Sequence, residues 1–331
     1  MISLRSGRPQ ANAPPGGTRE QDTPRSFESL TACGPATHLA ACYTSPMAPE
    51  LSGGIRDRLR EWTYALGGPG TRARLEKLTP PRNEYGVDPY GFDAEYTVAA
   101  VAPLLWLYRR YFRVEVHGID RVPSEGRVLL VSNHSGQLPF DGAMIEVAFL
   151  FDRDPPRAVR ALMDTWVPTL PFVSTFMARC GQVVGTTENC RRLLAADEAL
   201  LVFPEGTRGL NKLFKHRYQL QRFGTGFLRL ALETGAPVVP VGVVGAEEQA
   251  PALFDLKPLA RLFSFPALPV TPTLLPFPLP SRYHIHFGAP MSFEGSPDED
   301  DEQLEGKVAQ VADAVRALLA RGLAERRHVF W

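Results

Sequence analysis

The stretch VLLVSNHSGQLPFDG (residues 128–142) sets an apolar run directly against Asn-His, and an aspartate follows seven positions after the histidine. Short apolar runs bounded by turn residues are typical of strands that are buried on both faces of a sheet. In open sheets of this kind, ligands bind outside the carboxyl ends of the strands. The stretch therefore predicts a buried strand that delivers polar side chains to a ligand-binding loop.

The rest of the chain alternates between strand-like and helix-like segments. The predicted strands are residues 114–118, 127–133, 158–163, 199–203 and 238–245, and the predicted helices are residues 141–151, 187–196, 226–234 and 300–321. Thr187 is the expected N-cap of its helix. Fully apolar strands that alternate with helices indicate an α/β fold: a single domain with a mostly buried, mixed or parallel sheet flanked by helices.

Composition divides the chain into three regions and excludes some partners. Residues 1–46 are rich in Pro, Gly, Ser and Thr, which predicts a disordered low-complexity tail. Residues 47–96 are expected to form a helical segment and a linker or arm, and residues 97–327 the main domain. The charges balance at 36 basic and 36 acidic residues, so no nucleic-acid partner is expected. The four cysteines form no CxxC pair, which favours a reducing cytoplasm over a disulfide or zinc framework.

Two apolar segments each have two possible roles. Residues 97–108 are too short to span a bilayer, which takes about 20 residues, and basic and aromatic residues follow them. They form either a helix of the core or a helix at a membrane interface. Residues 258–280 are hydrophobic but broken by prolines, so they form either a lid over the core or a surface for an acyl chain or a membrane.

His134 and Asp141 are the first candidates for chemistry. A general base that works near neutral pH is most naturally a histidine, and a carboxylate on its other nitrogen fixes the tautomer. The alternative is that Asp141 caps the following helix and that His134 is a polar loop residue. These two residues alone leave both interpretations open.

The sequence FPEGTRG (residues 203–209) follows another apolar strand and is a candidate anion site. The guanidinium of Arg208 presents parallel N–H donors that suit a phosphate, and the glycines permit a tight backbone. A glutamate such as Glu205 is unusual beside an anion, so its expected role is to bind an arginine or a substrate hydroxyl. A local basic cluster follows at Lys212, Lys215, His216 and Arg217. Alone, the segment is also consistent with an ordinary turn that carries surface charges.

NHSGQLPFD, then LVFPEGTRG, then APVVPVGVVG occur in the order found in PlsC-type glycerolipid acyltransferases, and the chain resembles that family over about residues 105–290. The resemblance implies that residues 97–327 form an acyltransferase domain, that His134 is the general base and that Asp141 orients it. It assigns acceptor binding to Phe203, Pro204, Glu205, Gly206, Thr207 and Arg208. It also places residues 181–194 in a second acceptor-binding block, in which Arg191 and Arg192 are weak candidates.

The resemblance further implies the partners and the location of the protein. The acyl donor is acyl-CoA or acyl-carrier protein as a co-substrate, the acceptor is a lysophospholipid or diacylglycerol, and the protein associates peripherally with a membrane surface from the cytoplasm. No cofactor and no metal are expected, and His284-x-His286 is interpreted as structural. No GxSxG motif is present, which argues against a serine hydrolase.

The sequence departs from the family pattern at one place. Six residues separate His134 from Asp141, where the family usually has four. The two side chains can still meet, because a turn rather than a helix separates them. The reaction that the resemblance implies most simply is lysophosphatidate to phosphatidate. The longer spacing is more similar to that of a branch that acylates diacylglycerol or another neutral lipid alcohol, which is the alternative. A non-catalytic lipid-binding protein of the same fold is the third alternative.

Overall fold

The computed structural model describes residues 53–78, 83, 86–256, 269–272 and 277–330, which belong to one compact unit. The predicted disordered tail, residues 1–46, lies outside the described residues, and so does most of the proline-broken segment 258–280.

The core of the unit is a seven-stranded mixed sheet in the order β1-β9-β6-β2-β5-β3-β4. Its strands are β1 (Glu115–His117), β2 (Val128–Ser132), β3 (Val159–Met163), β4 (Val183–Val184), β5 (Ala199–Val202), β6 (Val238–Val244) and β9 (His284–Phe287). β2 runs parallel to both β5 and β6, and β9 is antiparallel to β6. A separate pair joins β7 (Phe254–Asp255) to β8 (Pro269–Val270). The predicted α/β fold with a buried mixed sheet is confirmed.

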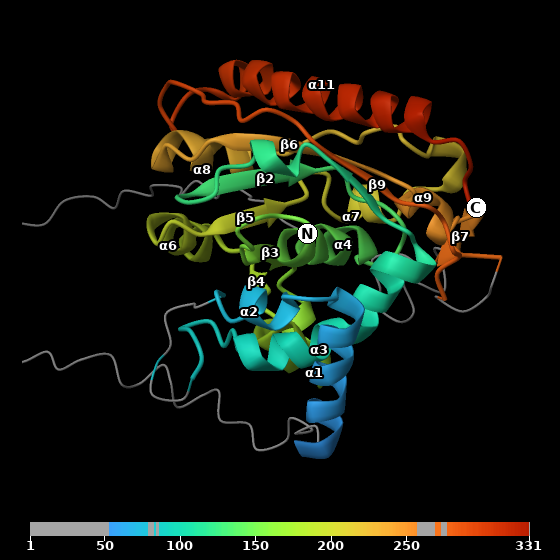
Figure 1. The fold of residues 1–331 in the computed structure, drawn as a ribbon. Coiled ribbons are helices and arrows are strands. Elements are labelled where there is room, and N and C mark those ends of the chain that lie inside the picture. The colour runs from blue at the N-terminus through green and yellow to red at the C-terminus, as the bar shows by residue number, and fades with distance from the viewer. Residues whose placement is uncertain (1–52, 79–82, 84–85, 257–268, 273–276, 331) are drawn as a thin grey trace, which may run out of the picture. The chain divides into compact units, whose positions relative to one another are not determined.

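Helices cover both faces of this sheet (Figure 1). The α-helices of the described residues are α1 (Gly53–Gly67), α2 (Thr71–Leu75), α3 (Ala94–Trp106), α4 (Phe140–Phe151), α5 (Val173–Arg179), α6 (Thr187–Ala195), α7 (Thr207–Leu210), α8 (Gly226–Thr234), α9 (Ala246–Gln249) and α11 (Asp301–Glu325). None of the helices in the described part of the chain is long and apolar enough to cross a bilayer.

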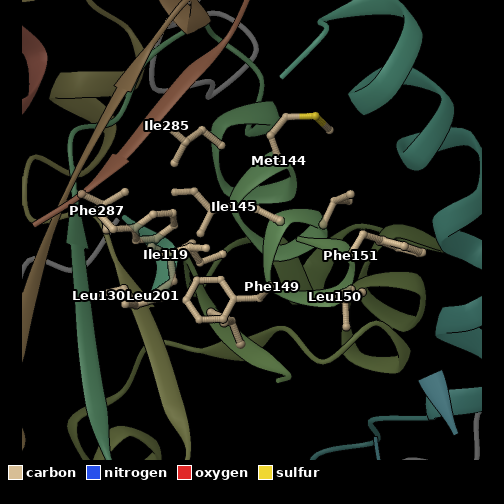
Figure 2. Close-up of a cluster of buried hydrophobic side chains, with 14 of the residues drawn as sticks. Ile119, Leu130, Met144, Ile145, Phe149, Leu150, Phe151, Leu201, Ile285 and Phe287 are labelled. Atoms are coloured by element: carbon tan, nitrogen blue, oxygen red, sulfur yellow. The ribbon is translucent and has the colours of Figure 1, made fainter. Parts of the chain in front are cut away.

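Alternate residues of β2 enter two hydrophobic clusters, one on each face of the sheet. Val128 and Leu130 pack with α3 and α4 in one cluster, and Figure 2 shows the α4 side chains Ile145 and Phe149 against the sheet. Leu129 and Val131 pack with α6, α8 and α11 in the other. Because both faces are covered, β2 is buried along its whole length, as its continuous apolar sequence predicts.

The apolar segment 97–108 belongs to the core. Its helix α3 buries Val101 and Leu105 in the cluster shared with α4, whereas Trp106 at its end is exposed. α1 packs along α3, and the Thr63 hydroxyl donates to the Val98 carbonyl at 2.7 Å. The segment therefore packs on the core, as the first of the two interpretations expects.

Two predicted helix boundaries are wrong. The N-cap of α6 is Thr186 rather than Thr187, because the Thr186 hydroxyl accepts the hydrogen bond from the Asn189 amide at 3.2 Å. α11 runs on to Glu325 instead of ending near residue 321. Leu319 and Gly322 are buried in that last part, so contact with the sheet continues the helix beyond the predicted end.

Candidate active site

The structure brings His134 and Asp141 together. The Nδ1 atom of His134 lies 2.7 Å from Oδ2 of Asp141, whose side chain is fully buried, whereas the His134 side chain is 12% exposed. The six intervening residues form a turn that ends where α4 begins. The expectation that a turn lets the two side chains meet despite the longer spacing is confirmed.

Asp141 is not the N-cap of α4. Pro139 occupies the N-cap position, and Asp141 lies in the first turn of the helix. Its Oδ2 also accepts from the Ser135 amide at 3.0 Å, and its Oδ1 accepts from the Gly142 amide at 2.8 Å. These bonds fix the carboxylate so that one oxygen faces the imidazole, which removes the alternative that Asp141 serves merely as a helix cap.

Three distant segments hold the loop that carries His134. The side chain of Asn133 exchanges two hydrogen bonds with the backbone of Val243 in β6, at 2.8 and 3.1 Å. The His134 amide donates to Oε1 of Glu205 at 3.0 Å, and Nε2 of Gln249 donates to the Gly136 carbonyl at 3.0 Å. The loop is therefore fixed by contacts from β6, α9 and the loop after β5.

The segment after β5 lies against the His134 loop. β2 and β5 are parallel neighbours, so their carboxyl ends reach the same edge of the sheet. The Phe203 ring stacks on the His134 imidazole with 4.1 Å between ring centroids and 24° between planes. A Cβ atom at Gly209 would lie 2.8 Å from the His134 carbonyl oxygen, so this close approach requires glycine. An apolar cavity of about 30 Å³ adjoins Phe203 and Pro204.

Glu205 and Lys212 are both buried and bond to neighbouring segments of the site. The Glu205 side chain is fully buried, and its carboxylate accepts from the His134 and Gln221 amides at 3.0 and 2.6 Å. Burial raises the pKa of this carboxyl. Lys212 is buried too, 2.8 Å from Glu247 and 4.0 Å from Glu205. Glu205 therefore connects the two loops, and Lys212 does not belong to an exposed basic cluster.

The remaining predicted cations lie on the surface. Arg208 is exposed, and its guanidinium donates to the Arg222 carbonyl at 3.1 Å. Lys215, His216 and Arg217 are exposed close by. Arg191 and Arg192, the weak candidates of the second block, pair on the surface with Glu233 and Glu188, respectively. Gly185 and Thr187 of that block do line the cavity beside Phe203.

The buried polar residues of α9 were not predicted from the sequence. Glu247 pairs with Lys212, Gln249 holds the Gly136 carbonyl, and the Tyr283 hydroxyl donates to Gln249 at 2.5 Å. The available signal was the sequence AEEQ one residue after the apolar strand 238–244, which resembles the polar segments that follow β2 and β5. A polar run at the carboxyl end of a third neighbouring strand supports the same site.

Known proteins match this chain across the site. A family model described as Acyltransferase matches residues 113–244. An uncharacterized protein of Mycobacterium tuberculosis is 42% identical over 260 residues, which are 75% of this chain and 72% of that protein. The 1-acyl-sn-glycerol-3-phosphate acyltransferase alpha of Mus musculus is 29% identical over 224 residues, 64% of this chain and 65% of that protein.

A solved structure, the 1-acyl-sn-glycerophosphate acyltransferase PlsC of Thermotoga maritima, has a TM-score of 0.48 and 17% identity, and covers 82% of this chain and 98% of its own. The family model spans both the His134 loop and the segment after β5, and the mouse relative carries the activity in its name. The chain therefore belongs to the PlsC-type glycerolipid acyltransferase family, whose enzymes transfer an acyl group from a donor to a lipid acceptor.

Proposed function

We propose that this enzyme transfers a fatty acyl group from acyl-CoA or acyl-carrier protein to a glycerolipid hydroxyl, most simply converting lysophosphatidate to phosphatidate, with His134 as the general base. The observation that carries this proposal is the 2.7 Å contact between His134 Nδ1 and the buried carboxylate of Asp141. A carboxylate in this position holds the tautomer in which Nε2 is free to accept a proton.

In the proposed reaction, Nε2 of His134 removes the proton from the acceptor hydroxyl as its oxygen attacks the thioester carbonyl. The new carbon–oxygen bond forms, the carbon–sulfur bond breaks, and the leaving thiolate takes the proton from the His134 imidazolium, which restores the neutral base. Asp141 stabilises the imidazolium between these two steps. The Phe203 ring keeps the imidazole plane fixed against the loop after β5. No cofactor enters this scheme.

Arg208 is the proposed ligand of the acceptor phosphate. It lies on α7, directly after the Phe203 segment, and its guanidinium is exposed. Thr207 and the Gly206 backbone lie beside it, whereas Glu205 acts by holding the His134 loop. An exposed guanidinium at this place can bind a phosphate or another polar headgroup and so bring the acceptor hydroxyl to His134.

An exposed apolar patch supports peripheral membrane association. Trp166, Phe172, Val173 and Phe176 are all more than two-fifths exposed. They follow β3, which runs parallel to β5, so the segment leaves the same edge of the sheet as His134 and Phe203. Aromatic residues are favoured at membrane interfaces. A lipid acceptor would then reach the site from the bilayer surface.

The test is acyl transfer from radiolabelled acyl-CoA to lysophosphatidate by the purified chain. His134→Ala should abolish turnover, and Asp141→Asn should reduce it by about 10³- to 10⁴-fold, as loss of the tautomer does in a hydrolase triad. His216→Ala, which removes an exposed histidine, is the control and should leave turnover unchanged. Full activity in His134→Ala would refute the assignment of the base.

The same assay with two lipids identifies the acceptor class. Arg208→Ala should impair acylation of lysophosphatidate far more than acylation of diacylglycerol, because only the former carries a phosphate. Lys215→Ala, a neighbouring exposed cation, is the matched control. Equal losses on both lipids would remove the phosphate-binding role and favour a neutral lipid alcohol. Lipid binding without turnover in the unmodified chain would favour the non-catalytic alternative.

A further inference from the structure

Three histidines meet on the face of the sheet that α11 covers. His117 in β1 is paired in register with His286 in β9, and His284 lies on the same side of β9. The rings of His117 and His286 stack with centroids 4.4 Å apart and 11° between planes. A Cβ atom at Gly322 of α11 would lie 3.1 Å from the His286 ring, so glycine makes room for the imidazole there.

Most of the ring nitrogens in this cluster are buried without a hydrogen-bond partner. They are Nε2 of His117, both nitrogens of His284 and Nε2 of His286, and the side chains of His284 and His286 are only 5% and 2% exposed. Nearly all buried polar atoms in proteins have a partner. A bound ligand would give these buried nitrogens the partner that they lack.

We propose that His117, His284 and His286 bind a divalent transition-metal ion, most simply zinc, with Glu325 as the fourth ligand. One nitrogen from each histidine lies within 4.8 Å of the other two, and Oε2 of Glu325 lies 3.7 Å from Nε2 of His286. Ligands of a tetrahedral zinc ion with bonds of about 2.0 Å lie roughly 3.3 Å apart. The histidine χ2 torsion angles are broadly distributed, so rotation of the rings can bring the ligand nitrogens to this spacing.

The surroundings provide what a histidine-rich metal site needs. Oε2 of Glu115 lies 3.5 Å from Nδ1 of His284, the position of an outer carboxylate that orients a ligating imidazole through its second nitrogen. The nearby arginines are already paired with carboxylates, Arg282 with Glu115 and Arg321 with Glu325. Three imidazoles and a carboxylate form a ligand set typical of zinc.

The ion would join three elements that are far apart in the sequence. β1 is an edge strand of the sheet, β9 pairs with it, and Glu325 ends α11. A bound ion therefore stabilises the sheet edge against the last helix. The cluster is separate from His134, so this proposal does not depend on the proposed reaction, and its test uses binding and stability rather than turnover.

The test uses the full chain after treatment with a chelator, with zinc sulfate as the probe. We expect one zinc ion per chain in a competition titration against a chromogenic chelator, and a rise in melting temperature when zinc is added. His286→Ala and His117→Asn should abolish both effects, and Glu115→Gln should weaken binding by about 10- to 100-fold. His328→Ala, which removes an exposed histidine outside the cluster, should behave as the wild type.

If the variants do not fold, X-ray absorption of the zinc-loaded wild type shows how many imidazoles bind the ion. Back-scattering from three imidazoles would support the site, whereas fewer than three would overturn it. The proposal also fails if zinc leaves the melting temperature of the wild type unchanged, or if binding persists in a triple variant in which His117, His284 and His286 are all replaced by alanine.

Discussion

Asn133 and Val243 extend the contact between β2 and β6 beyond the last paired residues of the two strands. Backbone pairing of these strands ends at Ser132 and Val241. Oδ1 of Asn133 then accepts from the Val243 amide at 2.8 Å, and its Nδ2 donates to the Val243 carbonyl at 3.1 Å. The residue directly before His134 is thus fixed to the sheet, so the imidazole starts from a rigid position.

Asn133→Ala is expected to cost both stability and activity. It leaves two buried backbone groups of Val243 without partners, which destabilises the fold by about 2–4 kcal/mol and loosens the His134 loop. Asn133→Asp should be worse, because a carboxylate then faces the Val243 carbonyl. Urea unfolding and acyl-transfer rates measure the two effects. Asn189→Ala, which removes a single bond to the Val184 carbonyl, is the control and should keep its turnover; a normal rate in Asn133→Ala would contradict the role of this contact.

Gly136→Ala should reduce turnover at least about tenfold, a loss of about 1.4 kcal/mol or more in transition-state stabilisation. Gly136 has a φ of 89°, and a Cβ atom there would lie 2.4 Å from the Ala246 carbonyl oxygen and 2.3 Å from Gln249. The substitution therefore breaks the contact that holds the loop. Gly126→Ala is the matched control, because Gly126 has a φ of 75° and open space around the added carbon. It should lose about 1–2 kcal/mol of stability from backbone strain but keep wild-type turnover. Equal rates in the two variants would rule out the proposed contact.

The sequence predicted the elements whose signal is local. The apolar runs of β2, β5 and β6 and the spacing of α6, α8 and α11 identify these elements without reference to any other part of the chain. The meeting of His134 and Asp141 was also predictable, because the intervening residues form a turn. Local pattern was therefore enough for β1, β2, β3, β5 and β6 and for the two residues closest to the proposed chemistry, but it did not predict β4 or the strand order.

The supports of the site were not predictable, because they pair residues far apart in the chain. Lys212 was placed in a basic cluster and Glu205 was expected to bind an arginine or a substrate hydroxyl, yet each is buried against a partner from another segment. Gln249 bonds to Gly136 across more than a hundred residues. Nothing in the local composition of these segments shows which charge is buried, since burial depends on where the loops after three different strands meet.

Glu146 should make the stability of the protein depend on pH. Its Oε1 is buried without a partner and its Oε2 accepts from Gln182 at 2.9 Å; burial raises the pKa of the carboxyl from 4.5 to about 8. The folded state then keeps a proton that the unfolded state has lost. This stabilisation is complete below pH 4.5 and is lost as the pH rises through 8, at roughly 1.4 kcal/mol per pH unit.

Urea unfolding of the wild type and of Glu146→Gln between pH 4.5 and 9 isolates this contribution. The glutamine cannot titrate, so the free energy of unfolding of the wild type should fall relative to that of the variant as the pH rises, by on the order of 4 kcal/mol in all. The two curves should become parallel above about pH 8, once the carboxyl has lost its proton in the folded state as well. Curves that are parallel over the whole range would show that Glu146 ionises alike in both states.

The exposed patch on α5 should govern binding to lipid vesicles. Phe172 and Phe176 are 59% and 42% exposed, and burying the exposed part of each side chain in a bilayer interface contributes about 1–2 kcal/mol. Phe172→Ser with Phe176→Ser should therefore weaken binding to anionic liposomes in a sedimentation assay, and should raise the KM for lipid-embedded acceptor while leaving turnover of a short, water-soluble acceptor unchanged. Leu253→Ser with Phe254→Ser is the comparison, because those side chains are equally exposed beside the proline-broken segment. If only this second pair releases the protein from liposomes, the membrane-facing surface lies there, and the α5 patch has another role.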